Sequence, residues 1–394
     1  MKRVLSLSTL YPNAHTPRFG TFVARSLEAL AARGDWDVTV INPIGVPPLA
    51  LGRYRDVAAA AVDGREHGVN VYRPRFTLIP KVGARSNPAA IARTALPIAR
   101  RLHRERPFDL LDAQFFWPDG PAVARLAGSL GLPFSIKARG SDITFWGGQD
   151  YARKAMVQAA DEATGLLAVS AALRRDMVAL GMPAHRIALH YTGLDRDRFR
   201  PLAHQGLRST LGQRLGLPLR EGEPLLATVG ALIERKGQDI VIGALAGLPE
   251  ARLLLVGNGP EESYLKRLAS DVGVADRVHF LGSVDHDLLP VILSAADAMV
   301  LPSSNEGLAN AWVEALACGT PLVIANAGGA RELVTSRDAG LIVGRDPESV
   351  AAGVRTLLDA PPSPLAVAAM ADRFSWEANA AALSDFYDTI LAAT

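Results

Sequence analysis

The chain has 394 residues, 49% of them apolar, which is enough for two compact domains rather than one. Its net charge of +2 conceals an asymmetry: residues 1–200 carry 28 Lys and Arg against 17 Asp and Glu, and the remainder carries 14 against 23. The single cysteine, Cys318, excludes an intramolecular disulfide and a thiolate metal cluster, and no apolar run reaches the roughly 20 residues of a membrane span.

Short β-branched or leucine-rich runs alternate with helical periods along the chain. In the first half we expect strands near residues 3–8, 37–41, 109–113, 133–137 and 165–169, and helices at 19–33, 119–130 and 171–180. The alternation restarts with strands at 225–230, 252–257, 278–282, 298–301 and 321–325, each followed by a helix. It predicts an α/β protein with two Rossmann-like domains, each a doubly wound parallel sheet, facing a central cleft.

A segment rich in proline and glycine, residues 199–224, is predicted to link the domains. The first domain then spans residues 1–198 and the second 199–375. A last helical stretch, 376–394, can cap either domain, and packing back on the first is our assignment. Residues 1–8 are too short and too soon interrupted for a secretory signal, so we expect a cytoplasmic protein.

Residues 89–106 combine a helical period with clustered basic side chains, among them Arg100, Arg101, Arg104 and Arg106. This pattern is typical of a helix on the inner face of the cell membrane, and equally of a solvated arginine face. With the basic first half it indicates an acidic partner, either a phosphate-bearing substrate or an anionic membrane surface, and no nucleic acid is expected.

Two acids eight residues apart stand at a strand-to-helix junction. Glu306 follows the predicted strand at 298–301, and Glu314 lies in the next helix. Carboxylates suit sugar hydroxyls, and the N–H groups that open a helix favour phosphate. The residues that supply them here are Gly307, Leu308, Ala309 and Asn310. Acids and amides together indicate a nucleotide sugar, although acids are common enough for this spacing to arise by chance.

Further glycine-containing or basic segments follow predicted strands. Gly230 ends one strand, and Arg235 and Lys236 follow it, where they can neutralise a diphosphate. A turn at 257–260 is interpreted as structural, whereas free N–H groups at 327–332 are expected to meet the donor. In the first half, Gly20 and the segment containing Arg139 and Asp142 are expected to face the ligand.

Taken together, these segments resemble the retaining GT-B glycosyltransferases of family 4. The resemblance covers nearly the whole chain and is densest at residues 230–237, 257–260, 297–303, 306–314, 317–321 and 328–329. It implies transfer of a sugar, typically a hexose, from a nucleotide diphosphate donor with retention of anomeric configuration and without a metal or other cofactor. The acceptor would be a saccharide, a lipid-linked glycan or a small molecule, as in polysaccharide biosynthesis, bound by the first domain.

The resemblance also implies residue roles. Lys236 would stabilise the diphosphate, Glu306 would lie beside the donor sugar, Glu314 would hold ribose hydroxyls, and the backbone N–H of Gly20 would approach the phosphate. The chain departs from the family pattern at two places. Ala231 stands where an arginine is usual, so Arg235 can supply that charge and join Lys236 and Glu306 as a catalytic residue. Arg139 replaces a histidine, which indicates an anionic donor sugar or acceptor.

Other site types fit less well. Three Asp-x-Asp triplets could hold Mg²⁺ or Mn²⁺, but each has a plainer home in a turn or at a helix start, and no metal is expected. His190, at a strand end, is interpreted as a packed residue rather than a catalyst. Two alternatives remain for the function: another GT-B enzyme, such as a phosphorylase or nucleotide-sugar epimerase, and a non-catalytic nucleotide-sugar-binding protein.

Overall fold

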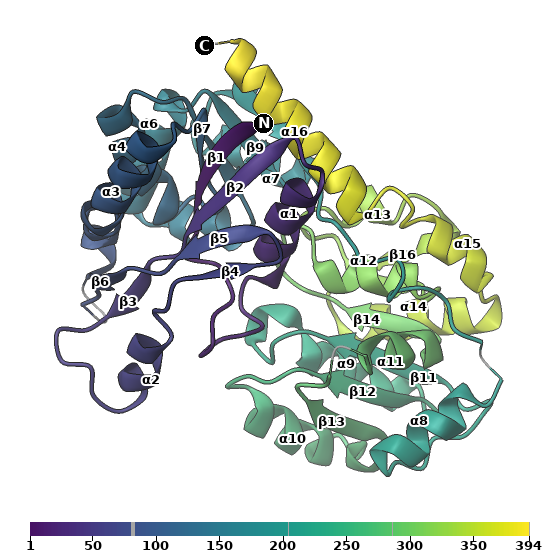
Figure 1. Cartoon of the computed structure of the whole chain (residues 1–394). Coiled ribbons are helices and arrows are strands. Elements are labelled where there is room, and N and C mark those ends of the chain that lie inside the picture. Colours follow the sequence, from purple (N-terminus) through teal and green to yellow (C-terminus); the bar gives the residue numbers. More distant parts are fainter. Residues whose placement is uncertain (80–82, 204, 286, 394) are drawn as a thin grey trace. The chain divides into compact units, whose positions relative to one another are not determined.

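The computed structural model describes residues 1–79, 83–203, 205–285 and 287–393, which divide into two compact units (Figure 1). Unit 1 comprises Met1–Gly193 and Trp376–Thr394, and unit 2 comprises Leu194–Ser375. Unit 2 therefore begins five residues before the predicted boundary at 199. Within the described ranges, no helix has the length and apolarity needed to cross a bilayer.

Unit 1 is built on an eight-stranded sheet in the order β10-β9-β8-β7-β1-β2-β5-β4. Its strands are β1 (Lys2–Leu7), β2 (Trp36–Ile41), β4 (Gly64–Glu66), β5 (Val69–Tyr72), β7 (Leu110–Ala113), β8 (Phe134–Ala138), β9 (Gly165–Ala168) and β10 (Ile187–Leu189). All pair in parallel except β4, which pairs antiparallel with β5 and corrects the expectation of a purely parallel sheet. Every residue of β7, β8 and β9 is buried, as in a sheet covered on both faces.

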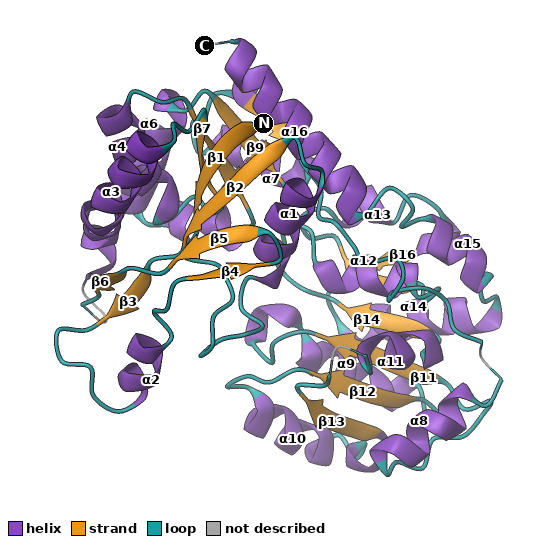
Figure 2. Ribbon diagram, viewed as in Figure 1, coloured by secondary structure: helices purple, strands orange, loops and turns teal. Residues whose placement is uncertain are grey.

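Two short strands, β3 (Ile44–Val46) and β6 (Arg75–Thr77), form a separate parallel pair in unit 1. The helices of this unit are α1 (Thr21–Ala32), α2 (Arg53–Ala59), α3 (Asn87–Glu105), α4 (Asp119–Leu130), α5 (Ser141–Thr144), α6 (Asp150–Glu162), α7 (Ala171–Ala179) and α16 (Trp376–Ala392), with single 3-10 turns η1 (Gly83–Ser86), η2 (Trp146–Gly148) and η3 (Ala184–Arg186). Figure 2 shows them as purple ribbons around the orange strands.

The last helix, α16, packs against α1 in unit 1. Its residues Leu383, Tyr387 and Ile390 join one apolar core with Val23 and Leu27 of α1. Polar contacts fix its register, because Ser26 Oγ donates to the side-chain oxygen of Asn379 at 2.6 Å and Trp36 Nε1 donates to Ser384 Oγ at 3.1 Å. Residues 194–375 thus separate two parts of one domain.

Unit 2 is built on a six-stranded parallel sheet in the order β13-β12-β11-β14-β15-β16. Its strands are β11 (Leu225–Val229), β12 (Arg252–Val256), β13 (Val278–Gly282), β14 (Ala298–Leu301), β15 (Leu322–Ala325) and β16 (Gly340–Val343). The surrounding helices are α8 (Leu207–Leu215), α9 (Gln238–Ala244), α10 (Glu262–Asp271), α11 (Leu289–Ala295), α12 (Asn310–Ala317), α13 (Ala330–Leu333), α14 (Pro347–Asp359) and α15 (Pro364–Ala369), with 3-10 turns η4 (Glu234–Lys236), η5 (Leu245–Gly247), η6 (Ala275–Arg277) and η7 (Arg337–Ala339).

The segment predicted as a linker, 199–224, contains α8 and belongs to unit 2. Arg208 anchors this helix: its buried guanidinium donates to the carbonyl oxygens of Ala295 and Glu223 and pairs with Asp297 at 2.5 Å. The prolines and glycines that suggested a linker flank the helix instead of excluding it. The linker prediction was therefore wrong for residues 207–215.

Each sheet has a point at which its winding direction reverses. In unit 1 it lies at β1, between β2 and β7, and in unit 2 it lies between β11 and β14. Ligands of open α/β sheets bind beyond the carboxyl ends of the strands at such points. The loops after β1, β11 and β14 carry candidate site residues predicted from the sequence, among them Gly20, Lys236 and Glu306.

Candidate active site

Two loops of unit 2 meet at the reversal point of its sheet. After β11 the chain passes through Gly230, whose φ of 155° strains any other residue, and forms the turn η4 that contains Arg235 and Lys236. After β14 the chain leads to Glu306. The amide of Ser304 donates to the carbonyl oxygen of Arg235 at 2.8 Å and ties the loops together.

The side chains of these loops form an ion cluster. Lys236 Nζ lies 2.5 Å from Glu306 Oε1, and Arg235 Nη1 lies 3.5 Å from the same oxygen. The Lys236 and Glu306 side chains are only 12% and 8% exposed, whereas Arg235 is 46% exposed. The structure thus joins the three predicted catalytic residues, with one buried pair and one accessible cation.

The loop after a third strand, β15, packs against the backbone of the Glu306 loop. Gly328 follows β15 with a φ of 49°, and a Cβ atom there would lie 1.9 Å from the carbonyl oxygen of Glu306. The N–H of Gly329 donates to the carbonyl oxygen of Gly307 at 2.9 Å. The expectation that the N–H groups of this turn are free for the donor was therefore wrong at Gly329, because the neighbouring loop uses that donor.

Glu314 lies in the middle of α12 with its carboxyl group partly buried. Burial raises the pKa of this carboxyl to about 7. Along the described part of the chain, no side chain or backbone group pairs with it. Helix α12 begins at Asn310, so Gly307, Leu308 and Ala309 lie in the loop and not in the helix start predicted for them. An unpaired carboxyl with a raised pKa is typical of a ligand-binding position.

Sequence reasoning missed Arg345, which follows β16. Its Nε donates to the carbonyl oxygen of Pro302 at 3.0 Å, and its Nη2 donates to that of Glu234 at 3.3 Å. Arg345 therefore clamps the start of the Glu306 loop to η4. The signal that selected Arg235 and Lys236, a basic residue after a predicted strand, was not available here because β16 was not among the predicted strands.

In unit 1, Gly20 precedes α1 at a tight crossing of the β1–α1 loop. It has a φ of 73°, and a Cβ atom would lie 2.4 Å from the carbonyl carbon of Leu10. Glycine is therefore required here by the fold. The approach of its backbone to a phosphate stays a prediction.

Arg139 follows β8 and is held in place by a neighbouring strand exit. Its Nε donates to the carbonyl oxygen of Gln114 at 3.1 Å, its Nη2 donates to the side-chain oxygen of Gln114, and its guanidinium lies 5.1 Å from the Phe22 ring centre. Gln114 in turn donates to the buried carboxylate of Asp112, which also accepts from Ser6 and Ser135 at 2.8 Å. Sequence reasoning missed Asp112 and Gln114, although polar residues at a buried strand end were the signal.

Asp142 holds the same loop from within. Its fully buried carboxylate accepts from the backbone N–H groups of Phe116, Arg139, Gly140 and Ile143 at 2.8–3.2 Å. With its oxygens enclosed in this way, Asp142 acts by shaping the loop that presents Arg139. We assign it this structural role in place of the ligand contact predicted for it.

Asp37 and Asp287, from two of the Asp-x-Asp triplets, and His190 have other partners. Asp37 pairs with Arg3 and Arg106, both at 2.9 Å, and Asp287 pairs with Arg198 at 3.5 Å. His190 is buried against Lys137, with Nζ and Nδ1 2.6 Å apart. Burial holds the pKa of both groups well below their usual values. His190 is thus a packed, hydrogen-bonded residue, as expected.

Comparison with known proteins identifies related sequences along most of the chain. The family model described as Glycosyltransferase Family 4 matches residues 19–198, and that described as Glycosyl transferases group 1 matches residues 213–374. The GDP-mannose-dependent alpha-(1-6)-phosphatidylinositol monomannoside mannosyltransferase of Mycobacterium tuberculosis is 33% identical over 280 residues, which cover 67% of this chain and 71% of the relative. The D-inositol 3-phosphate glycosyltransferase 2 of Catenulispora acidiphila is 36% identical over 250 residues, covering 58% and 57%.

A solved structure matches the full length. Sucrose-phosphate synthase from Thermosynechococcus elongatus superposes with a TM-score of 0.81 at 21% identity and covers 100% of both chains. At this identity the likeness shows the fold alone. The GT-B architecture of two doubly wound α/β domains, predicted from the sequence, is confirmed.

Proposed function

Because the chain belongs to glycosyltransferase family 4, we propose that it transfers a hexose from a nucleoside diphosphate hexose to a hydroxyl group of a phosphate-bearing acceptor. The transfer retains the anomeric configuration and needs no metal ion. Glycosyl transfer itself is the activity of the relatives named above. Our proposal adds the kind of donor, the retention of anomeric configuration and the kind of acceptor.

The ion pair between Lys236 and Glu306 is the observation that carries the proposal. Two opposite charges stand side by side at the sheet's reversal point, where a donor binds. Lys236, with the accessible Arg235 beside it, supplies positive charge to a departing diphosphate. Glu306 supplies acceptor oxygens to the hydroxyls of the donor sugar, and Glu314 does so for the ribose.

Retention follows from using the leaving group as the base. As the bond from the anomeric carbon to the diphosphate oxygen breaks, the bond to the acceptor oxygen forms on the same face. The acceptor's proton passes to the departing diphosphate. Positive charge at Lys236 stabilises that diphosphate during the step, and no protein nucleophile is required.

The position of Arg139 is one reason to propose an acceptor that carries phosphate. A guanidinium already fixed by Gln114 and backed by Phe22 binds an anion with little loss of side-chain freedom. Two relatives named above act on phosphatidylinositol monomannoside or inositol 3-phosphate, both of which carry phosphate. For the donor, the first of them points to GDP-mannose.

We also infer that α3 brings the enzyme to the anionic inner face of the cell membrane, where a lipid-linked acceptor would lie. Arg93, Arg100 and Arg104 are exposed on this helix. Arg101 pairs with Glu105 at 3.2 Å and Arg106 pairs with Asp37 at 2.9 Å. Two of the four arginines expected to meet lipid are therefore already paired with carboxylates.

A thermal-shift panel of GDP-, UDP- and ADP-hexoses tests the donor. A ligand at 100 times its Kd stabilises the folded chain by about 2.7 kcal/mol, and we expect GDP-mannose to give the largest shift. Absence of a shift with every nucleotide sugar would overturn the proposal. Product analysis separates the alternatives: sugar 1-phosphate formed from inorganic phosphate indicates a phosphorylase, an epimerised donor indicates an epimerase, and binding without turnover indicates a non-catalytic protein.

A further inference from the structure

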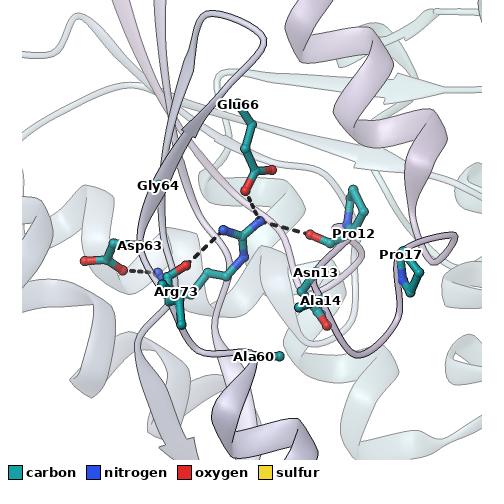
Figure 3. A pocket seen from close by; sticks show the side chains of 10 residues that line it. Pro12, Asn13, Ala14, Pro17, Ala60, Asp63, Gly64, Glu66 and Arg73 are labelled. Carbon is teal, nitrogen blue, oxygen red and sulfur yellow. Dashed lines mark hydrogen bonds and ion pairs between the residues drawn. The ribbon is translucent and has the colours of Figure 1, made fainter.

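A pocket of about 430 Å³ lies in unit 1. Its walls are the β1–α1 loop at residues 12–17, the segment 60–66, which ends with β4, and Arg73, which follows β5 (Figure 3). A volume of this size lies within the range of small-molecule sites. None of the residues given a role in transfer lines it.

Arg73 holds the two walls together. Its side chain is only 5% exposed; Nη2 donates to the carbonyl oxygen of Pro12 and Nη1 to that of Val62, each at 3.0 Å. Nη2 also pairs with Glu66 Oε1 at 2.6 Å (Figure 3). One buried guanidinium therefore fixes the loop and the strand segment at a set spacing, so the pocket is formed before any ligand arrives.

Polar groups in the pocket have unused hydrogen-bonding capacity. Asp63 is exposed and accepts the N–H of Arg73 at 2.7 Å through one carboxylate oxygen. Asn13 accepts from the backbone N–H groups of His15 and Thr16 through its side-chain oxygen, which leaves its amide nitrogen to donate. The Nε atom of Arg73 is buried and has no hydrogen-bond partner among the described residues.

The charges and the apolar surface of the pocket select the kind of ligand. Arg73 is balanced by Glu66, and Asp63 adds a further carboxylate, so an anion gains little here. Pro12, Pro17, Ala14 and Ala60 supply apolar surface between the polar groups. A ring with several hydroxyls and an apolar face of C–H groups fits both features.

We propose that this pocket binds a neutral sugar ring of the acceptor, one that does not itself receive the transferred hexose. Sugar hydroxyls donate to the Asp63 carboxylate and accept from the Asn13 amide, while the face of the ring covers the proline and alanine surface. That the sugar belongs to an acceptor rests on the proposed function. The site itself is defined by its own residues.

Alanine-methyl NMR of the full chain tests the site, because Ala14 and Ala60 line it. The probes are the methyl glycosides of mannose, glucose, galactose and N-acetylglucosamine, with myo-inositol 1-phosphate as the anionic probe. We expect at least one glycoside to shift the Ala60 methyl signal saturably and the inositol phosphate to leave it unmoved. Shifts from the anion alone, or from none of the glycosides, overturn the site.

Substitution in the exposed loop gives a matched pair of variants. Ala14→Phe fills the pocket and abolishes the Ala60 shift, whereas His15→Phe adds the same ring one residue away, outside the lining, and leaves the shift intact. Both variants keep the thermal shift given by GDP-mannose. If Ala14→Phe retains the glycoside response, the pocket assignment is wrong. A chain that responds to glycosides but binds no nucleotide sugar refutes the proposed function and not the site.

Discussion

Lys236 and Glu306 stand 70 positions apart in the sequence, yet their charged atoms lie 2.5 Å apart between the exits of β11 and β14. A buried cation of this kind is already neutralised, so an arriving diphosphate has to share it with the carboxylate. We propose that the pair keeps the lysine in place and that its charge becomes available to the diphosphate when Glu306 turns toward the donor sugar.

Removal of either member of the pair is expected to lower turnover by about 100-fold or more, since each acts on charge or orientation at the reacting centre. Lys236→Ala and Glu306→Ala are measured by steady-state transfer from a nucleotide sugar. Glu306→Gln is the informative companion, because it releases Lys236 and is expected to keep or strengthen binding of the nucleoside diphosphate while turnover falls. Near-normal rates in both alanine variants contradict the assignment.

Donor affinity should depend on pH through Glu314. The pKa of its carboxyl is raised to about 7 by burial, so the ionised form that accepts ribose hydroxyls develops as the pH rises through 7. We expect nucleotide affinity, measured by isothermal titration, to fall about tenfold from pH 8 to pH 5, the worth of one hydrogen bond to a charged group. Glu314→Gln removes this pH dependence if the ribose role is correct.

The same carboxyl has the opposite effect on stability. Its pKa is higher in the folded chain than the usual 4.5, so folding is favoured below pH 4.5 and that contribution is lost as the pH rises through 7. Glu314→Gln should therefore melt close to the wild type at pH 4.5 and above it at pH 8. Equal melting temperatures at both values would show that the carboxyl is well solvated.

Activity is expected to survive chelation. In the proposed mechanism the positive charges of the transfer step are Lys236 and Arg235, and Asp37 and Asp287, from two of the Asp-x-Asp triplets, pair with arginines. Transfer rates measured with EDTA and with added Mn²⁺ should agree. Loss on chelation that Mn²⁺ restores would require a metal site that this assignment lacks.

Arg139→Leu is expected to raise the KM for a phosphate-bearing acceptor by about 10- to 100-fold, because a hydrogen bond to a charged group contributes roughly 1.5–3 kcal/mol. Donor KM should stay unchanged. Arg139→Lys keeps the charge but loses the fork that Gln114 holds, so it should recover part of the effect. Arg153→Leu, on the surface of α6, is the matched control, and an equal effect there would remove the assignment.

Vesicle binding should distinguish Arg100 and Arg104, which form no ion pair among the described residues, from Arg101 and Arg106, which do. Replacing Arg100 and Arg104 by Gln is expected to weaken co-sedimentation with anionic vesicles by about 1 kcal/mol per residue. The matched change of Arg101 and Arg106, which already pair with Glu105 and Asp37, should have a smaller effect. No co-sedimentation of the wild type at 0.1 M salt would favour a soluble acceptor and a solvated helix face.

The sequence was sufficient for the architecture because apolar runs and helical periods are local properties. It predicted the strands β1, β2, β7, β8 and β9 and all but β16 of the second sheet within a few residues. It missed α8, because the signal for that helix is weak and its anchor, Arg208, makes contacts up to 89 positions away. The three-residue β4 was likewise too short to show a period.

For the site, the sequence could indicate which loops hold the candidate residues. It could not indicate which hydrogen-bonding groups of those loops are already used by neighbouring loops. Placing Lys236 and Glu306 at exits of adjacent strands predicts that they lie close. It does not predict that the N–H of Gly329 is already used by Gly307, or that Asp142 is enclosed by four backbone donors. Such competition for partners depends on three-dimensional geometry and is set only when the loops have folded.

The return of α16 to unit 1 has a consequence for the order in which the protein can mature. During synthesis the first 193 residues leave the ribosome without the helix that completes their core, and they wait for 182 intervening residues to be made. Val23, Leu27 and Trp36 lack their core partners Leu383, Tyr387 and Ile390 during that interval. Unit 2 is a continuous segment and can fold completely before α16 is made. Unit 1, although its synthesis starts first, is therefore the last to complete its core.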